Sequence, residues 1–123
     1  MRHKKHLKKF HRTEEERKRL WIDLCTALIL NKKIETFTVR GKWFRARFDR
    51  LVTLCKRANG DTKLAFSSVR PYLSEKVARE LIENIVPKML ERNGGYTSQL
   101  KLFKPFQTSG FSRSYIRIVG FGA

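Results

Sequence analysis

The sequence predicts an α+β fold with two layers, in which a small mixed three-stranded sheet is covered on one side by helices. Several segments repeat apolar residues with the spacing of a helix that has one apolar face. Three shorter segments are rich in β-branched residues or alternate apolar with polar residues, as strands do. Along the chain these segments follow the order α-β-α-α-α-β-β.

The first helix is expected to begin after Thr13. Thr13 and Glu16 have the spacing of a capping box, in which each side chain bonds the backbone N–H of the other residue. Apolar residues then recur on one helical face, at Leu20, Trp21, Leu24, Cys25 and Leu28. The helix is expected to end near residues 31–33.

A short strand and a basic helix are expected next. Residues 34–38 alternate and are rich in β-branched side chains, and Thr38 is then expected to cap a helix over residues 39–56. The apolar stripe of this helix comprises Phe44, Phe48, Leu51, Val52 and Cys55. The other arc carries Arg40, Lys42, Arg45, Arg47, Arg50 and Arg57 against one acid, Asp49.

The second half of the chain is expected to hold two helices and a hairpin. Asp61 or Thr62 caps a short helix that ends near Ser68, and Ser74 caps a longer helix over residues 74–92. Pro87 lies inside the apolar pattern of the longer helix and predicts a kink or a broken turn. A turn at residues 93–95 ends this helix, and residues 96–104 and 113–119 are expected to pair as an antiparallel hairpin.

The strongest functional signal is the charge. Lys and Arg total 28 against 11 Asp and Glu, which gives a formal net charge of +17. Such an excess repels itself in a compact state, so we expect an anionic partner. No apolar run approaches the roughly 20 residues that cross a bilayer, and no secretory signal is expected. Nucleic acid is therefore favoured over a membrane as the partner.

Residues 1–12 are expected to form a basic arm, and residues 13–123 a single globular domain. The arm lacks acids and has no amphipathic period that would let it fold alone. Its expected nucleic-acid contacts are Arg2, His3, Lys4, Lys5, Lys8, Lys9 and Arg12. On the basic helix the expected contacts are Arg40, Lys42, Arg45, Arg47 and Arg50. The helix at 74–92 is neutral overall, so it is expected to face solvent or a protein neighbour.

Two aromatic residues have competing interpretations. Trp43 lies off the apolar stripe of its helix, and packing at the edge of the core is favoured over stacking on an unpaired base. Tyr96 is a candidate nucleic-acid contact by stacking or hydrogen bonding, but it is equally consistent with a strand residue packed on the core.

Catalysis, cofactors, a small-molecule substrate and a metal site are not expected. Gly94-Gly95 lacks the Lys and the spacing of a phosphate-binding loop. The three histidines His3, His6 and His11 lie on the arm without a nearby carboxylate or thiol, which disfavours a metal site. Cys25 and Cys55 occupy apolar helix positions and are expected to be reduced and buried.

Several segments resemble the L-seventeen family of bacterial-type large-subunit ribosomal proteins. The resemblance is carried by Met1-Arg2-His3-Lys4-Lys5, Ile34-Glu35-Thr36, Arg40-Gly41-Lys42, Leu51-Val52-Thr53-Leu54-Cys55-Lys56 and Gly94-Gly95-Tyr96-Thr97. Arg12 and Arg17 fall where the family carries arginines, and Lys101 follows the turn into the hairpin, so Arg17 and Lys101 join the expected RNA contacts. Departures from the family pattern occur at Glu16, Trp43, Phe44, Ser98 and residues 105–110.

The resemblance implies a structural constituent of the large ribosomal subunit. It implies binding to large-subunit ribosomal RNA near the peptide exit tunnel, beside neighbouring ribosomal proteins, with a role in assembly and translation. The expected location is the cytoplasmic ribosome of a bacterium, with an organellar ribosome left open. The alternative is a small basic DNA-binding protein of the nucleoid type, which shares the charge argument. A protein-interaction module is a third class.

Overall fold

The computed structural model describes residues 12–58, 60–102 and 112–121. The elements in chain order are α1 (Glu14–Asn31), β1 (Lys33–Phe37), α2 (Thr38–Arg57), α3 (Thr62–Val69), α4 (Glu75–Glu80), the π-helical turn η1 (Leu81–Ile85), the 3-10 turn η2 (Val86–Met89), β2 (Thr97–Leu102) and β3 (Arg113–Ile118). The predicted α+β class and the predicted order of helices and strands are confirmed, except that the helix expected at 74–92 is divided into three pieces.

The sheet has the strand order β1-β3-β2, and both pairings are antiparallel. The prediction of a mixed sheet is therefore wrong. β1 and β2 run in the same direction, but β3 lies between them, so they never pair with each other. A parallel pair would require two strands of the same direction to be neighbours. The predicted antiparallel hairpin of the last two strands is confirmed.

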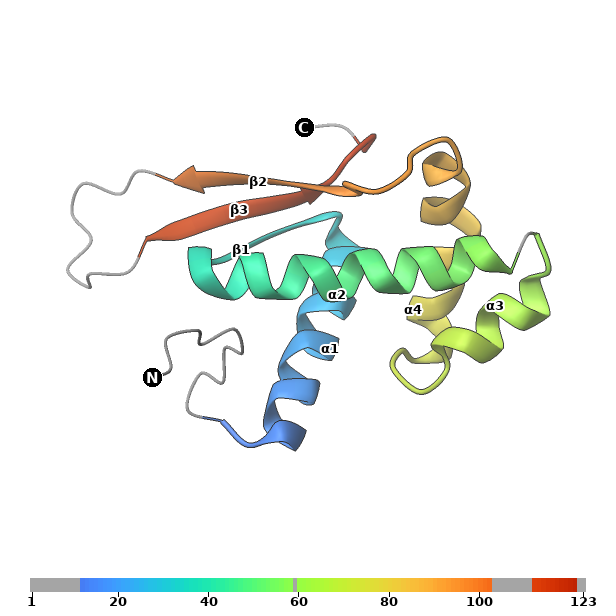
Figure 1. The fold of residues 1–123 in the computed structure, drawn as a ribbon, viewed down its shortest axis with the longest axis horizontal. Coiled ribbons are helices and arrows are strands. Elements are labelled where there is room, and N and C mark those ends of the chain that lie inside the picture. Colours follow the sequence, from blue (N-terminus) through green and yellow to red (C-terminus); the bar gives the residue numbers. More distant parts are fainter. Residues whose placement is uncertain (1–11, 59, 103–111, 122–123) are drawn as a thin grey trace, which may run out of the picture.

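The helices cover one face of the sheet, as predicted. In β3, Ser114, Ile116 and Ile118 are fully buried, while the residues between them point to the other face. The long helix α2 runs along the sheet. In Figure 1, α1 crosses α2 at a steep angle, and α3 and α4 lie near the C-terminal end of α2. Phe44 and Phe48 of α2 are fully buried in the same apolar core.

The start of α1 follows the predicted capping box. The Thr13 backbone N–H donates to Glu16 Oε1 at 2.9 Å, and the Glu16 N–H donates to Thr13 Oγ1 at 3.2 Å. Hydrogen bonding of the Glu16 carboxylate to the Thr13 backbone N–H, and then to the Thr13 side chain, lowers the pKa of the Glu16 carboxyl. The helix ends at Lys32, whose φ of 67° lies in the left-handed region. The Lys32 ammonium donates to the Ile29 carbonyl at 2.9 Å and to Glu80 Oε2 at 2.8 Å.

The junction of β1 and α2 differs from the prediction. Thr38 is the first residue of α2 and not its cap; Phe37 holds the cap position without a side-chain bond. The Thr38 hydroxyl lies 2.7 Å from Ser114 Oγ and accepts a hydrogen bond from Ser112 Oγ at 2.8 Å. These hydroxyl groups pair with one another beside the core, because polar atoms there need partners. The Thr38 hydroxyl therefore connects α2 to β3.

Local signals in the second half are largely confirmed. Asp61 Oδ1 accepts from the Leu64 N–H at 3.2 Å and caps α3. Ser74 holds the cap position of α4, although its side chain makes no capping bond. The helical path changes before Pro87, first to the wide turn η1 and then to the tight turn η2. Proline has no N–H to continue the helical ladder, so the predicted broken turn is confirmed.

Candidate nucleic-acid interface

Five arginines from α1, α2 and the residue before α1 are linked by a hydrogen bond or by mutual repulsion. We call them the α1–α2 arginine surface: Arg12, Arg17, Arg40, Arg47 and Arg50. Arg17 Nη1 donates to the Arg12 carbonyl at 2.6 Å, which holds these two residues together. On α2, positions 40, 47 and 50 follow helical spacing along one flank of the apolar stripe. All five were predicted RNA contacts, and the structure places them close together.

Like charges crowd one another on this surface. Partial burial lowers the pKa of Arg40, and the positive charges of Arg12 and Arg113 lower it further. Partial burial also lowers the pKa of Arg47, and repulsion by Arg50 and then by Arg17 lowers it further. Guanidinium groups stay protonated in proteins, so the surface keeps its charge. An anion placed among these side chains would relieve that repulsion.

Arg47 is held in place before any partner binds. Its guanidinium carbon lies 4.4 Å from the centre of the Trp43 ring, and its Nη1 donates to the Trp43 carbonyl at 3.2 Å. Trp43 itself is partly buried against the core, which confirms the prediction of packing at the core edge. A cation fixed over an aromatic ring loses less freedom on binding than a mobile one. The buried Nε of Arg40 has no hydrogen-bond partner within the described residues.

Two of the predicted RNA contacts bond to other parts of the protein. Arg45 lies on the opposite flank of α2, where its Nε donates to Thr97 Oγ1 at 2.8 Å and its Nη2 to the Thr97 carbonyl at 2.9 Å. Tyr96 is only 3% exposed, and its hydroxyl accepts from Lys56 Nζ at 3.0 Å. The structure therefore corrects the placement of Tyr96: its ring packs on the core and is not available for stacking on a base.

The remaining predicted contacts lie elsewhere. Lys42 shares the flank of Arg45 by helical spacing and is exposed, and Lys101 is exposed on β2 opposite Ser114. Neither belongs to the α1–α2 arginine surface. The candidates of the arm, Arg2, His3, Lys4, Lys5, Lys8 and Lys9, lie outside the described residues.

Arg113 was missed by the sequence reasoning. Its guanidinium carbon lies 4.9 Å from the Phe37 ring centre, and that of Arg40 lies 5.5 Å from the same ring. Arg113 Nε also donates to Glu35 Oε2 at 2.7 Å. Phe37 thus links the α1–α2 arginine surface to the uncovered face of the sheet. The alternation of Arg113 with Ser114 in the last strand was the signal that could have identified it.

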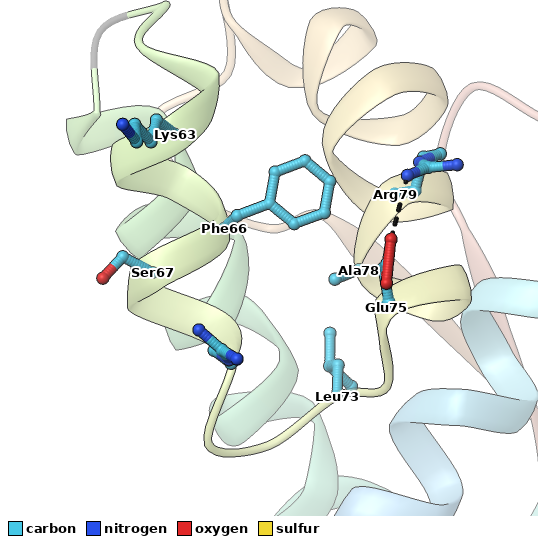
Figure 2. A pocket seen from close by; sticks show the side chains of 8 residues that line it. Lys63, Phe66, Ser67, Leu73, Glu75, Ala78 and Arg79 are labelled. Atoms are coloured by element: carbon cyan, nitrogen blue, oxygen red, sulfur yellow. Dashed lines mark hydrogen bonds and ion pairs between the residues drawn. The ribbon is translucent and has the colours of Figure 1, made fainter.

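A hollow of about 790 Å³ lies between α3 and α4. Figure 2 shows the Phe66 ring pointing from α3 toward α4, where Glu75 and Arg79 form an ion pair of 3.1 Å. Ser67 points away from that pair, and no His or Cys lines the hollow. The hollow therefore brings together neither a nucleophile with a base nor a set of metal ligands.

Other chemical sites were sought in the part of the chain that the structure describes. Within these ranges no three His, Cys, Asp or Glu residues gather in a way that could hold a metal ion. Cys25 and Cys55 are free and buried, as predicted. Burial raises the pKa of the Cys55 thiol to about 11 and also raises the pKa of the Cys25 thiol. None of the described helices is long and apolar enough to span a membrane.

Comparison with known proteins decides the family. A family model described as Ribosomal protein L17 matches residues 20–119. The chain belongs to the ribosomal protein L17 family. One relative is the Large ribosomal subunit protein bL17 of Sulfurihydrogenibium sp. (strain YO3AOP1), which is 41% identical over 102 residues that cover 83% of each chain. The protein of the same name from Persephonella marina is 39% identical over 104 residues, which cover 85% of this chain and 83% of that protein.

Membership of the ribosomal protein L17 family confirms the resemblance seen in the sequence. It also confirms that the chain is not an enzyme, because its relatives are named as ribosomal proteins. A further bL17 relative, from Chlorobium phaeobacteroides, is 39% identical over 103 residues, which are 83% of this chain and 60% of that longer protein. The chain is therefore a ribosomal protein, and the alternative of a nucleoid-type DNA-binding protein loses its support.

Proposed function

We propose that the chain is a structural constituent of the large ribosomal subunit and binds large-subunit ribosomal RNA through the α1–α2 arginine surface. The observation that carries the proposal is the crowding of these five arginines, none of which forms an ion pair within the described ranges. Ordinary protein surfaces mix charges of both signs. A surface of one sign whose groups repel one another is suited to neutralising phosphates.

The chemistry of this surface fits recognition of a folded RNA backbone. Arginine side chains bind phosphate oxygens in a bidentate manner, and each neutralised phosphate releases condensed counterions. Double-stranded RNA is recognised mainly by shape and by contacts to its backbone, since side chains do not reach into its deep major groove. The five arginines therefore supply affinity and orientation without reading a base sequence.

The arm, residues 1–12, extends this surface in the proposal. Arg12 is its last residue and belongs to the α1–α2 arginine surface, so the other cations of the arm are joined to the domain at this surface. An extended basic segment that orders on RNA loses conformational entropy, and its phosphate contacts must offset that cost in free energy. Lys42, on the other flank of α2, and Lys101, on β2, would touch RNA only if the RNA extends to those two elements.

The finer location follows from the family resemblance. We place the chain near the peptide exit tunnel of a bacterial-type ribosome, in the cytoplasm or in an organelle, where it supports assembly and translation. Neighbouring ribosomal proteins would contact the region from α4 to η2, whose charges balance. No membrane and no small-molecule substrate take part.

A binding competition tests the proposal. The full chain is bound to labelled large-subunit ribosomal RNA at moderate salt, and unlabelled ribosomal RNA or duplex DNA of equal phosphate concentration is added. We expect the ribosomal RNA to compete at least tenfold better, and we expect the chain to cosediment with large subunits after a high-salt wash. Equal competition by duplex DNA, together with loss from washed subunits, would overturn the proposal and favour a general DNA-binding protein.

A further inference from the structure

A second, smaller hollow lies where α1, α2 and the turn between α3 and α4 meet. It has a volume of about 220 Å³. Its lining includes two aromatic residues, Trp21 and Tyr72, two arginines, Arg47 and Arg50, and the apolar side chains of Leu51 and Leu54. Figure 1 shows the three elements from which these residues come, with α2 above and α1 and the α3–α4 turn below it.

The aromatic residues form one wall of this hollow. The ring centroids of Trp21 and Tyr72 lie 5.3 Å apart with an interplanar angle of 44°. Both residues pack against the core but are only partly buried, so part of each ring is accessible. Lys18 Nζ lies 5.7 Å from the Tyr72 ring centre. Such a wall offers an aromatic face with a cation beside it.

The arginines give the hollow its charge. Arg47 and Arg50 both belong to the α1–α2 arginine surface, so the hollow opens within the proposed RNA-binding region. No acid lines it. The larger hollow between α3 and α4 differs in this respect, because the Glu75 carboxylate lies on its lining. Of the two, the smaller hollow is complementary to an anionic ligand that also carries a flat ring.

We infer that this hollow holds the base of one unpaired RNA nucleotide, stacked on Trp21 and Tyr72, with the adjoining phosphates on Arg47 and Arg50. The inference deepens the proposed function and rests on it. A volume of about 220 Å³ lies below the roughly 300–1,000 Å³ of pockets that enclose drug-sized ligands, so it suits a single ring system. Proteins commonly read single-stranded RNA by stacking splayed bases on aromatic side chains and arginine planes.

An apolar side chain of a neighbouring protein is the competing occupant. It would use the aromatic wall but would bring no negative charge to Arg47 and Arg50, whose positive charges it would partly remove from water at a cost. A nucleotide satisfies both halves of the hollow, so charge complementarity favours it. The contribution of the base is what separates the two occupants in an experiment.

The test uses tryptophan fluorescence in the full chain. The sequence has two tryptophans, so Trp43→Phe leaves Trp21 as the reporter. The variant is titrated with a short single-stranded oligoadenylate and with an abasic oligomer of the same length and charge, while binding is followed independently by anisotropy. We expect the oligoadenylate to quench Trp21 and to bind roughly 5- to 150-fold more tightly than the abasic oligomer, the range that stacking of one base supplies. The abasic oligomer should leave Trp21 emission nearly unchanged.

Matched variants separate stacking from charge. In Trp21→Phe, which keeps Trp43 as the reporter, both oligomers should change the emission equally, because Trp43 responds only through Arg47. Tyr72→Leu should weaken oligoadenylate binding about fivefold or more and leave abasic binding unchanged. Tyr115→Leu, on the uncovered face of the sheet, should alter neither affinity. Far-ultraviolet circular dichroism checks that each variant is folded.

The outcomes distinguish this inference from the proposed function. Binding of both oligomers with the same affinity and the same Trp21 response overturns the base site while leaving the phosphate surface intact. The same holds if Tyr72→Leu weakens both oligomers equally. If neither oligomer nor ribosomal RNA binds at moderate salt, the proposed function itself fails, and the base site fails with it.

Discussion

Replacing three cations of the α1–α2 arginine surface by glutamine tests how the chain binds RNA. Arg17, Arg47 and Arg50 are chosen because their charges repel one another in the folded protein. Glutamine keeps a comparable helix propensity, so the helices should be retained. Each phosphate contact contributes about 0.9 to the slope of the logarithm of affinity against the logarithm of salt concentration. If each arginine neutralises one phosphate, the triple variant should lower that slope by about 2.7.

The difference in slope between wild type and variant determines the expected loss of affinity. Electrostatic contributions vanish near 1 M salt, so the lines of wild type and variant should converge there. At about 0.15 M salt a slope difference of about 2.7 then corresponds to a loss on the order of 10²-fold. Filter binding of large-subunit ribosomal RNA at five salt concentrations measures both quantities. The loss should be the same for RNAs of different sequence, because phosphate contacts do not read bases.

A control variant removes the same charge from another surface. Lys63, Lys76 and Arg79 are exposed on α3 and α4, and their replacement by glutamine lowers the net charge equally. We expect this control to change the slope by less than about 1. If both triple variants lower the slope by the same amount, the total charge and not the arginine surface controls binding, and the reasoning is refuted.

The other predictions concern the folded protein. Phe48→Ala should lower the free energy of unfolding in urea by about 3–5 kcal/mol, because a fully buried ring leaves a cavity, whereas Leu90→Ala at an exposed position should change it by less than about 0.5 kcal/mol. Burial raises the pKa of Asp49 above its unfolded value, so its ionised form disfavours folding at neutral pH. Asp49→Asn should therefore raise the melting temperature at pH 7, and the gain should vanish below about pH 3.9; a gain that persists in acid would contradict this cause. Cys55 should react with a thiol reagent at pH 8 about two orders of magnitude more slowly than a free thiol until the protein is unfolded, since burial raises the pKa of its thiol to about 11. Cys25, whose thiol pKa is also raised by burial, should react more slowly still; fast labelling of the native chain would show that the core opens.

Features with local causes could be predicted from the sequence. The capping box at Thr13 needs residues only three positions apart, and the broken turn before Pro87 follows from a missing N–H. The order of strands in the sheet has no local cause, because the first strand pairs with the last one across three helices. The cap expected at Thr38 failed for the same reason: its hydroxyl finds a better partner in a distant strand.

The candidate site divides in the same way. Composition and helical spacing identified the cations of α2, but they could not tell which flank faces the sheet. Arg45 and Arg47 are two positions apart in the sequence. Arg45 nevertheless donates a hydrogen bond to Thr97 of β2, whereas Arg47 is repelled by neighbouring arginines. The hollow depends on Trp21 and Tyr72, which are far apart in sequence and 5.3 Å apart in the fold. Such a site exists only after the helices have packed.

Salt should act on stability and on RNA binding with opposite signs. Arg40 and Arg47 lie among cations that repel them in the compact state, and the net charge of +17 adds to this repulsion. Raising the ionic strength from about 0.1 M to 1 M shortens the Debye length from roughly 10 Å to 3 Å, which screens repulsion between exposed groups. The urea midpoint of the RNA-free chain should therefore rise with sodium chloride, while its affinity for ribosomal RNA falls. The glutamine variant of Arg17, Arg47 and Arg50 should show a weaker salt dependence in both measurements, because one set of charges causes both effects. If salt leaves the stability of wild type and variant equally unchanged, the repulsion among these arginines does not destabilise the fold. The argument that a bound anion relieves this repulsion would then lose its physical basis.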